Sequence, residues 1–253
     1  MNSDQRTAWF RQAKYGMFLH WGLYSVRGVN EWAFFGGMYT TDEYAKLATG
    51  FTAAKYDPSE WVRVAKEAGM KYMVLTTRHH DGFALFDSKV SDFTAPKLST
   101  SGRDLVAEYV DAVRSAGLKV GLYYSPMDWR YKGAWDHLAH PASTTAMVDQ
   151  CFAQVRELLT NYGKIDLLWF DGTRCMDGYF DREATKTYQA GIWRAEEMHR
   201  MVFDLQPHIV INNRYILPGD YGTPEQRIEA TADGSMWESC LTMDPGGWGY
   251  IPF

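Results

Sequence analysis

The chain of 253 residues has little cysteine and no concentration of basic charge. Its three cysteines, Cys151, Cys175 and Cys240, are odd in number and widely spaced. This pattern excludes a disulfide framework and a CxxC-type metal site, so we expect reduced, structural thiols. The 26 basic residues are outnumbered by 31 acidic ones, the net charge is −5, and no basic run could follow a phosphate backbone. Nucleic acid is therefore not an expected partner.

Long apolar runs are also absent. The N-terminal sequence MNSDQRTAWFRQAKYG has no apolar stretch of about seven or more residues, which forms the core of a secretory signal. Nowhere do about 18 apolar residues follow one another, as a membrane-spanning helix requires. With 46% hydrophobic and 23% charged residues, the composition is that of a soluble globular protein. We predict a cytoplasmic protein without a membrane partner.

Aromatic residues, in contrast, are abundant, at 15% of the chain. Large rings usually pack cores, so a thick core is the first interpretation. A cleft that stacks on sugar rings or bases is the alternative.

Residues 57–69 have the pattern of a complete amphipathic helix. Asp57 is the predicted N-cap, Pro58 takes the first helical position, Glu60 closes a capping box and Gly69 ends the helix. The apolar run MKYMVLTT follows directly, as expected for a strand that is covered on both faces.

The same order of helix and strand returns three times. We predict helices over residues 104–117, 144–162 and 188–205, followed by strands in LKVGLYYS, KIDLLWFDG and HIVINNR. KYGMFLHWG near the start and MWESC near the end bring the total to about six strands. Strands that alternate with helices are typical of a parallel sheet with right-handed crossovers.

Polar or aromatic residues end each predicted strand, and this favours a barrel over an open sheet. Barrel enzymes build their sites from many strand ends, whereas an open sheet usually has a glycine-rich phosphate loop, which is absent here. We therefore predict an α/β fold with a (β/α)8-like, TIM-type barrel. Eight such units would need more residues, so we expect one catalytic domain over residues 1–253, truncated after about six strands. The open side would be covered by a homo-oligomer or closed with fewer helices.

Asp171 is the first candidate for chemistry. It follows four apolar or aromatic residues in LLWFDG, where burial of a carboxylate is costly unless a charged partner or hydrogen bonds stabilise it. Gly172 would allow a ligand to approach closely. A cap of the following loop is the structural alternative.

The HHDG sequence at residues 79–82 and His20 form the second candidate. Adjacent histidines on a strand point to opposite faces, which argues against a shared metal unless the strand ends between them. Three imidazoles that converge at strand ends could still form a zinc site. One core and one solvated histidine is the structural interpretation.

Three glutamates downstream, Glu225, Glu229 and Glu238, form the third candidate. Glycoside hydrolysis needs two carboxyl groups at one bond, one of them ionised and the other protonated. Asp171 and one of these glutamates would supply both, and we expect the glutamate that acts as acid to be buried. At least two of the three are expected on the surface.

Taken in order, HWG, EW, TTRHHDGF, GLYYS, LWFDG, NNR, GTPEQ, WESC and WGY resemble the retaining α-L-fucosidases of glycoside hydrolase family 29. The resemblance extends from residue 9 to residue 250. It implies a (β/α)8-like barrel followed by a β-sandwich, and metal-free hydrolysis of terminal α-L-fucosyl linkages in fucosylated glycans or glycosides, without a cofactor. The β-sandwich and the last barrel strands would be missing here.

By this resemblance Asp171 is the nucleophile and Glu225 the preferred acid/base, with Glu229 and Glu238 in reserve. The resemblance also implies a set of sugar-binding residues, in which Trp248 lies near the fucose methyl group: His20, Glu31, Trp32, His79, His80, Tyr123, Trp169, Arg214 and Trp248. Arg214 would help to keep Asp171 ionised. Two other classes remain open. One is a metal-dependent hydrolase with His20, His79, His80 and Asp171 as ligands, and the other is a catalytically silent fucose-binding barrel.

Overall fold

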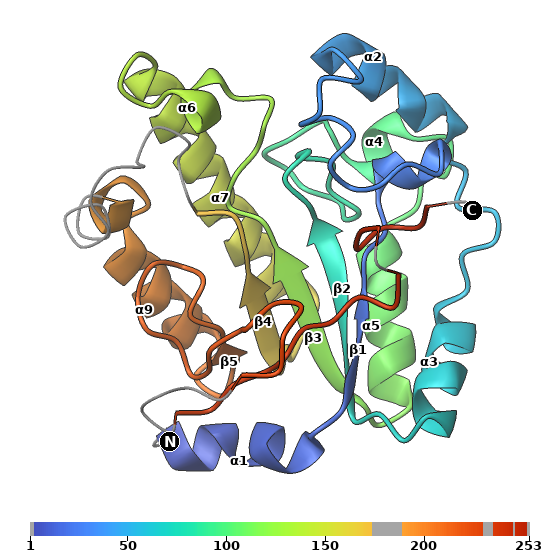
Figure 1. Cartoon of the computed structure of the whole chain (residues 1–253), viewed down its shortest axis with the longest axis vertical. Helices are drawn as coiled ribbons and strands as arrows, with labels where there is room; N and C mark the ends of the chain where they lie inside the picture. The colour runs from blue at the N-terminus through green and yellow to red at the C-terminus, as the bar shows by residue number, and fades with distance from the viewer. Residues whose placement is uncertain (1–2, 174–188, 230–234, 245, 252–253) are drawn as a thin grey trace.

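The computed structural model describes residues 3–173, 189–229, 235–244 and 246–251. Within these ranges five parallel strands form one sheet in the order β1-β2-β3-β4-β5, with helices between successive strands (Figure 1). The strands are β1 (Gly16–Leu19), β2 (Tyr72–Arg78), β3 (Lys119–Tyr124), β4 (Leu167–Phe170) and β5 (Val210–Ile211). The α/β class with a parallel sheet is therefore confirmed.

Helices of ten or more residues alternate with the strands, and shorter helical segments lie in the connecting loops. The longer helices are α1 (Ser3–Ala13), α3 (Pro58–Glu67), α5 (Leu105–Ser115), α7 (Pro141–Asn161) and α9 (Ala195–Leu205). The shorter ones are η1 (Leu23–Val26), α2 (Thr41–Lys46), η2 (Leu47–Gly50), α4 (Ala95–Leu98) and α6 (Lys132–Trp135). Among the residues described, no helix is both long and apolar enough to cross a membrane.

Local sequence signals explain where α3 begins and ends. The Asp57 side chain accepts hydrogen bonds from the backbone N–H groups of Ser59 and Glu60, and Gly69 follows the helix with φ +80°. The predicted capping box is wrong, because the Glu60 carboxylate pairs with Arg63 one turn further along at 2.6 Å.

The predicted helix over residues 188–205 is interrupted. Arg194 adopts a left-handed conformation with φ 50°, and α9 begins only at Ala195. Trp193 is fully buried, and its carbonyl accepts a hydrogen bond from Tyr215. Tertiary packing of this indole outweighs the continuous helical pattern. Tyr188, at the start of the prediction, lies outside the described residues, as does Cys175.

The sixth predicted strand, MWESC, does not form a regular strand. Trp237 and Cys240 make isolated parallel bridges to Gly222 and Glu225 instead of a ladder along β5. The carbonyl of Pro224 accepts the Cys240 N–H, but Pro224 has no N–H of its own to donate. A proline interrupts a ladder in this way.

The two faces of the sheet pack against different layers. One row of residues, Leu19, Leu75, Leu122, Leu168 and Ile211, is in register across all five strands and packs into the main core with the long helices. The opposite face forms a smaller, aromatic cluster with α1 and with the chain that follows β5, here called the C-terminal segment. That segment crosses the sheet from β5 toward β1 (Figure 1). The segment therefore covers the face from which the aromatic site residues project.

The two described cysteines are free and buried, as predicted. Burial raises the pKa of both the Cys151 and the Cys240 thiol to about 12, so both thiols are protonated at neutral pH.

Candidate functional site

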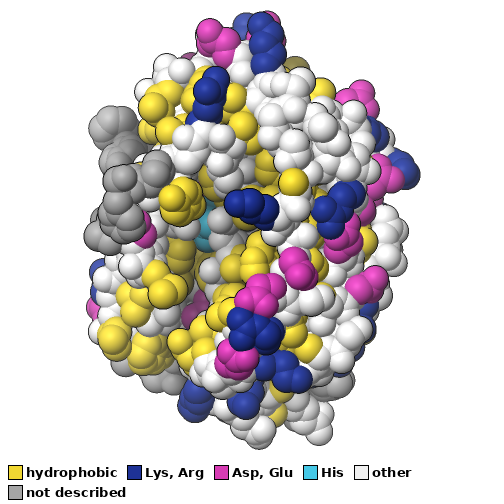
Figure 2. All heavy atoms as spheres, turned by 90° about the vertical axis from the view of Figure 1, so that its right-hand side faces the viewer, with side chains coloured by type: hydrophobic (Ala, Val, Ile, Leu, Met, Phe, Trp, Pro, Cys, Tyr) yellow, Lys and Arg dark blue, Asp and Glu magenta, His cyan; other side chains and the backbone are white. Residues whose placement is uncertain are grey.

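The predicted site residues come together at the carboxyl ends of the strands. His20 follows β1, His79 and His80 follow β2, and Asp171 follows β4. The other predicted residues are contributed by the loop after β1, by β3 and β4, and by the chain after β5: Glu31, Trp32, Tyr123, Trp169, Arg214, Glu225 and Trp248. Figure 2 shows a hollow on one face, with an imidazole inside it and hydrophobic side chains around it.

Asp171 is held by donors from three directions. Its Oδ2 accepts a hydrogen bond from the Tyr123 hydroxyl at 3.0 Å, and its Oδ1 accepts from Arg214 Nη1 at 3.0 Å and from the Gly172 N–H at 2.9 Å. Burial raises the pKa of this carboxyl, but the His80 imidazole in its protonated form, the Arg214 guanidinium and the hydrogen bonds from Arg214 and Tyr123 outweigh burial and lower it overall. The carboxylate is therefore ionised at neutral pH, and its side chain stays 24% exposed for access.

Arg214 joins the two predicted catalytic carboxylates. Its Nη1 binds Asp171, and its Nη2 donates to Glu225 Oε2 at 2.9 Å. The guanidinium also donates to the hydroxyl and the carbonyl of Thr223 and lies over the Trp169 ring, 4.6 Å from its centroid. Since arginine keeps its charge and presents a planar fork, this one side chain sets the relative position of both carboxylates.

Glu225 lies at the open side of this arrangement. Its second oxygen, Oε1, accepts a hydrogen bond from the Trp248 indole N–H at 3.1 Å. The side chain is 43% exposed, so the expectation of a buried acid is wrong for this residue. The loop after β5 places Glu225 beside the Arg214 guanidinium at a position that is open to solvent, which explains its exposure.

The histidines form one group, contrary to the expectation of opposite faces. β2 ends at Arg78, so His79 and His80 are not constrained by the strand alternation, and their ring centroids are 4.2 Å apart. Burial lowers the pKa of His20 to about 3, with Asp171 opposing this and His80 adding to it. Burial also lowers the pKa of His79 and His80, so all three imidazoles are neutral at neutral pH.

Two of these imidazoles have unused polar atoms. Nδ1 of His20 and Nδ1 of His79 are buried, and neither has a hydrogen-bond partner in the described part of the chain. Buried polar atoms without partners are costly, and they are frequent where a ligand supplies the missing contact.

Aromatic rings surround the polar groups. Trp169 stacks on Tyr123 with the ring centroids 5.6 Å apart, and the Trp248 ring lies 5.0 Å from that of His20. Trp32 is 44% exposed and approaches His80 edge-on at 5.9 Å. The site therefore combines an ionised carboxylate, a fixed cation, neutral imidazoles and aromatic walls.

A family model described as Alpha-L-fucosidase matches residues 1–253. The chain belongs to the alpha-L-fucosidase family.

Individual relatives agree with this. Tissue alpha-L-fucosidase of Rattus norvegicus is 31% identical over 282 residues, which cover 99% of this chain and 57% of the rat protein. Alpha-L-fucosidase isoenzyme 1 from Paenibacillus thiaminolyticus is 38% identical and superposes with a TM-score of 0.83 over 98% of this chain and 63% of its own. A GH29 alpha-L-fucosidase from Bacteroides thetaiotaomicron, solved as a trapped covalent intermediate in complex with 2-fluoro-fucosyl fluoride, is 28% identical, with a TM-score of 0.86 over 98% and 62%. The chain spans a little over half the length of the curated relatives it matches.

Glu31 has a specific contact in this fucosidase-family site. The residue is 1% exposed, and its carboxylate accepts hydrogen bonds from the backbone N–H groups of Trp248 at 3.1 Å and Gly249 at 2.7 Å. Both oxygens are thus engaged with the segment that presents the Trp248 ring. A direct contact of Glu31 with a sugar stays a prediction.

The two reserve glutamates are placed away from Asp171. Glu229 is 58% exposed and pairs with Arg227 on the surface. Glu238 accepts hydrogen bonds from the Tyr72 hydroxyl at 2.6 Å and from the Trp169 indole at 2.9 Å, and burial raises its pKa. Tyr72 is the first residue of β2, so Glu238 lies toward the amino ends of the strands, beneath the site.

The metal-ligand alternative gains no support from the geometry. Across the described ranges, no three His, Cys, Asp or Glu side chains are grouped so that they could hold a metal ion. The His20 ring packs against the rings of His79, Tyr123 and Trp248.

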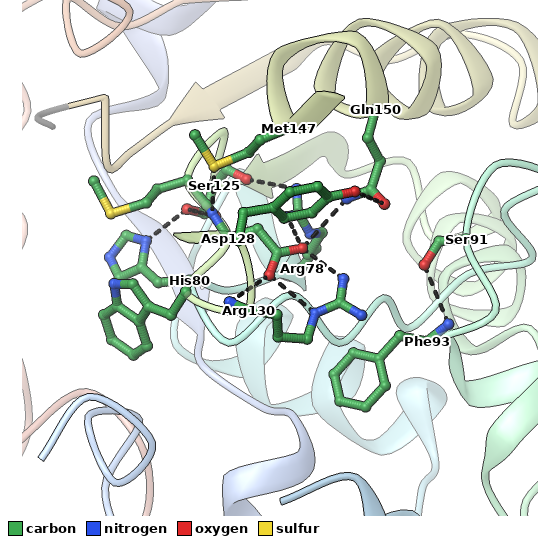
Figure 3. A network of polar contacts seen from close by, with 12 residues as sticks. Arg78, His80, Ser91, Phe93, Ser125, Asp128, Arg130, Met147 and Gln150 are labelled. Atoms are coloured by element: carbon green, nitrogen blue, oxygen red, sulfur yellow. Dashed lines mark hydrogen bonds and ion pairs between the residues drawn. The ribbon is translucent and has the colours of Figure 1, made fainter. Parts of the chain in front are cut away.

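A buried ion-pair network beside His80 was not predicted from the sequence (Figure 3). Arg78 and Asp128 are both fully buried and lie 2.7 Å apart, and Arg130 binds the same carboxylate at 2.5 and 2.9 Å. Burial raises the pKa of Asp128, but the two arginines outweigh burial and lower it. The sequence contained one signal for this network, the arginine that ends the apolar run before HHDG. Its partner could not be inferred, because Asp128 is distant in the sequence.

Proposed function

We propose that this chain hydrolyses terminal α-L-fucosyl linkages with retention of configuration, through a covalent fucosyl-enzyme intermediate. The observation that carries the proposal is the bridge in which one guanidinium, that of Arg214, holds both Asp171 and Glu225. Retaining glycosidases need two carboxyl groups close to one glycosidic bond, and this bridge brings two together.

In the first step Asp171 is the nucleophile. A carboxylate oxygen of Asp171 forms a bond to the anomeric carbon while the bond from that carbon to the leaving oxygen breaks, and Glu225 gives its proton to the leaving oxygen. In the second step a water molecule attacks the anomeric carbon and returns a proton to Glu225, and the bond to Asp171 breaks. Arg214 and Tyr123 keep the Asp171 carboxylate ionised and oriented before the attack.

Recognition of a 6-deoxy sugar needs polar groups for the ring hydroxyls and an apolar surface for the methyl group. The Nδ1 atoms of His20 and His79, which have no hydrogen-bond partner among the described residues, would serve the hydroxyls together with His80. Trp169 and Trp248 would supply the apolar surface, and Glu31 would keep Trp248 in place.

The solved relatives support the same chemistry. One of them was trapped as a covalent intermediate with 2-fluoro-fucosyl fluoride, and another, AlfC from Lactobacillus casei, was solved in complex with the α-L-fucose product. The fucosylated substrate is a proposal for this chain, since it spans only part of the length of its relatives.

We also infer that the five strands are consecutive strands of a (β/α)8-like barrel. Every strand is parallel to the strand that precedes it in sequence, and the order never reverses. A doubly wound sheet has a reversal in strand order, with the ligand at that point, whereas barrel strands follow in sequence.

The decisive experiment is trapping with 2-fluoro-fucosyl fluoride. We expect a fucosyl adduct on the peptide that contains Asp171, located by peptide mass, and no adduct in Asp171→Ala. We also expect Asp171→Ala to abolish release of a chromogenic fucoside. An adduct on another residue, or an Asp171→Ala variant that retains more than a few per cent of the activity, would refute the assignment. Binding of fucose without any turnover would favour the silent sugar-binding alternative.

A further inference from the structure

Ser125, directly after β3, contacts the imidazole of His80 at Nδ1 (Figure 3), whereas Asp171 lies near the other ring nitrogen. Its hydroxyl oxygen lies 2.5 Å from His80 Nδ1 and 3.0 Å from the carbonyl oxygen of Met127, and the serine is fully buried. A hydroxyl has a single hydrogen, and a carbonyl can only accept. One arrangement satisfies all three groups: Ser125 donates to Met127 and accepts from a protonated His80 Nδ1.

The other nitrogen of His80 faces the proposed nucleophile. Nε2 lies 3.6 Å from Asp171 Oδ2, which is too long for a hydrogen bond. Because burial and the cations Arg78 and Arg214 lower the pKa of His80 more than Asp171 and Glu225 raise it, the ring is neutral at neutral pH. A neutral ring with its proton on Nδ1 has a lone pair on Nε2.

We propose that Ser125 is a positioning residue that fixes the tautomer of His80 with the proton on Nδ1. Nε2 then accepts a hydrogen bond from a hydroxyl group of the ligand held beside Asp171. In the other tautomer Nε2–H would donate toward Asp171 Oδ2 and weaken that oxygen as a nucleophile. The identity of the hydroxyl as one of a fucosyl ring rests on the proposed function, whereas the tautomer itself does not.

The surrounding backbone holds Ser125 and His80 together. The Ser125 N–H donates to the Arg78 carbonyl at 3.0 Å, Arg78 Nη1 donates to the Ser125 carbonyl at 3.0 Å, and the Trp129 N–H donates to the His80 carbonyl at 2.8 Å. The ion pair of Arg78 with Asp128 anchors the same loop. The imidazole and the hydroxyl therefore have little freedom to separate.

Gly172 lies against both His80 and Ser125. It has φ +70°, and a Cβ there would lie 2.5 Å from His80 Cε1 and 3.1 Å from Ser125 Oγ. The glycine after Asp171 thus leaves room for the paired His80 and Ser125 side chains, which explains why the WFDG motif needs glycine at this position.

The tautomer can be read directly from imidazole ¹⁵N resonances of histidine-labelled protein, with the His80 signals assigned by their loss in His80→Gln. We expect the wild type to show a neutral ring with the proton on Nδ1, and Ser125→Ala to show a shift toward the Nε2–H tautomer. An Nε2–H tautomer or a charged ring in the wild type at neutral pH would overturn the proposal even if the variant fails to fold. An unchanged His80 pattern in folded Ser125→Ala would overturn it as well.

Kinetics supply the second readout. Ser125→Ala should lower kcat/KM for a chromogenic fucoside on the order of tenfold, the size expected for loss of one buried hydrogen bond. Ser88→Ala is the matched control, because Ser88 is equally buried and its hydroxyl accepts a hydrogen bond from Gln154 instead of from an imidazole. Ser125→Thr keeps the hydroxyl and should recover most of the rate.

Equal losses in Ser125→Ala and Ser88→Ala would count against a positioning role. If the wild type does not hydrolyse fucosides, the proposed function fails while the NMR result still decides the role of Ser125.

Discussion

Replacement of Arg214 tests the central bridge of the site most directly. Arg214→Met removes a cation that lies 3.0 Å from Asp171 and 2.9 Å from Glu225, while it keeps an apolar side chain over Trp169. A hydrogen bond to a charged group contributes about 1.5–3 kcal/mol. If one such contact is lost from the transition state, kcat/KM falls about 10- to 150-fold, and loss of both contacts should reduce it further.

The pH profile of Arg214→Met shows in which direction the pKa of Asp171 shifts when the guanidinium is removed. Asp171 must be ionised to attack, so activity is lost as the pH falls through its pKa. Arg214 is one of the charges that lower the pKa of Asp171 against the opposing effect of burial. His80 is neutral above its own lowered pKa and cannot replace that charge. We therefore expect the acid limb of kcat/KM to move to higher pH in Arg214→Met.

Two further variants separate charge from geometry. Arg214→Lys keeps the cation but cannot hold two carboxylates with a planar fork, so it should lose rate while its acid limb stays close to that of the wild type. Arg194→Met is the control, because Arg194 also pairs with two acidic residues, Asp149 on α7 and Glu197 on α9, and not with the two catalytic carboxylates. An Arg214→Met variant with an unchanged acid limb would refute the idea that this guanidinium keeps Asp171 ionised.

Three other substitutions have defined outcomes. Glu225→Ala should slow hydrolysis of fucosides with poor leaving groups much more than of those with good ones, because only poor leaving groups need a proton. Glu229→Ala should leave both rates unchanged, and equal effects of Glu225→Ala on both substrate classes would exclude Glu225 as the acid. Asp128→Ala leaves the buried Arg78 without its carboxylate, which should destabilise the fold by about 3–5 kcal/mol in chemical denaturation, and a loss below about 1 kcal/mol would contradict this account. Gly172→Ala places a Cβ 2.5 Å from an imidazole carbon at φ +70°, so we expect a lower Tm and a large loss of kcat; unchanged values of both would show that the backbone there can relax.

Much of the helix and strand order could be predicted because the signals are local. Asp57 and Asp104 cap their helices, and an apolar run follows each helix and forms a strand. The predictions failed where distant contacts decided the outcome. Trp193 packs against Tyr215 and breaks a helical pattern.

Several predictions concern properties that the structure does not test. The cytoplasmic localisation, the single catalytic domain over residues 1–253 and a homo-oligomer that covers the open side stay predictions. The expected absence of a cofactor also stays a prediction.

The sequence by itself determined which side chains stand at the ends of the strands, because strand and helix periodicity and the capping residues are properties of neighbouring positions. It thereby placed Asp171, His80 and Arg214 at one edge of a parallel sheet. Only the tertiary structure decided how they are used. Three features join residues that are not neighbours in the sequence: the bridge from Arg214 to two carboxylates, the two contacts of Glu31 with the chain before Tyr250, and the contact of Ser125 with His80. Such pairings depend on the packing of whole strands and loops, which no local pattern encodes.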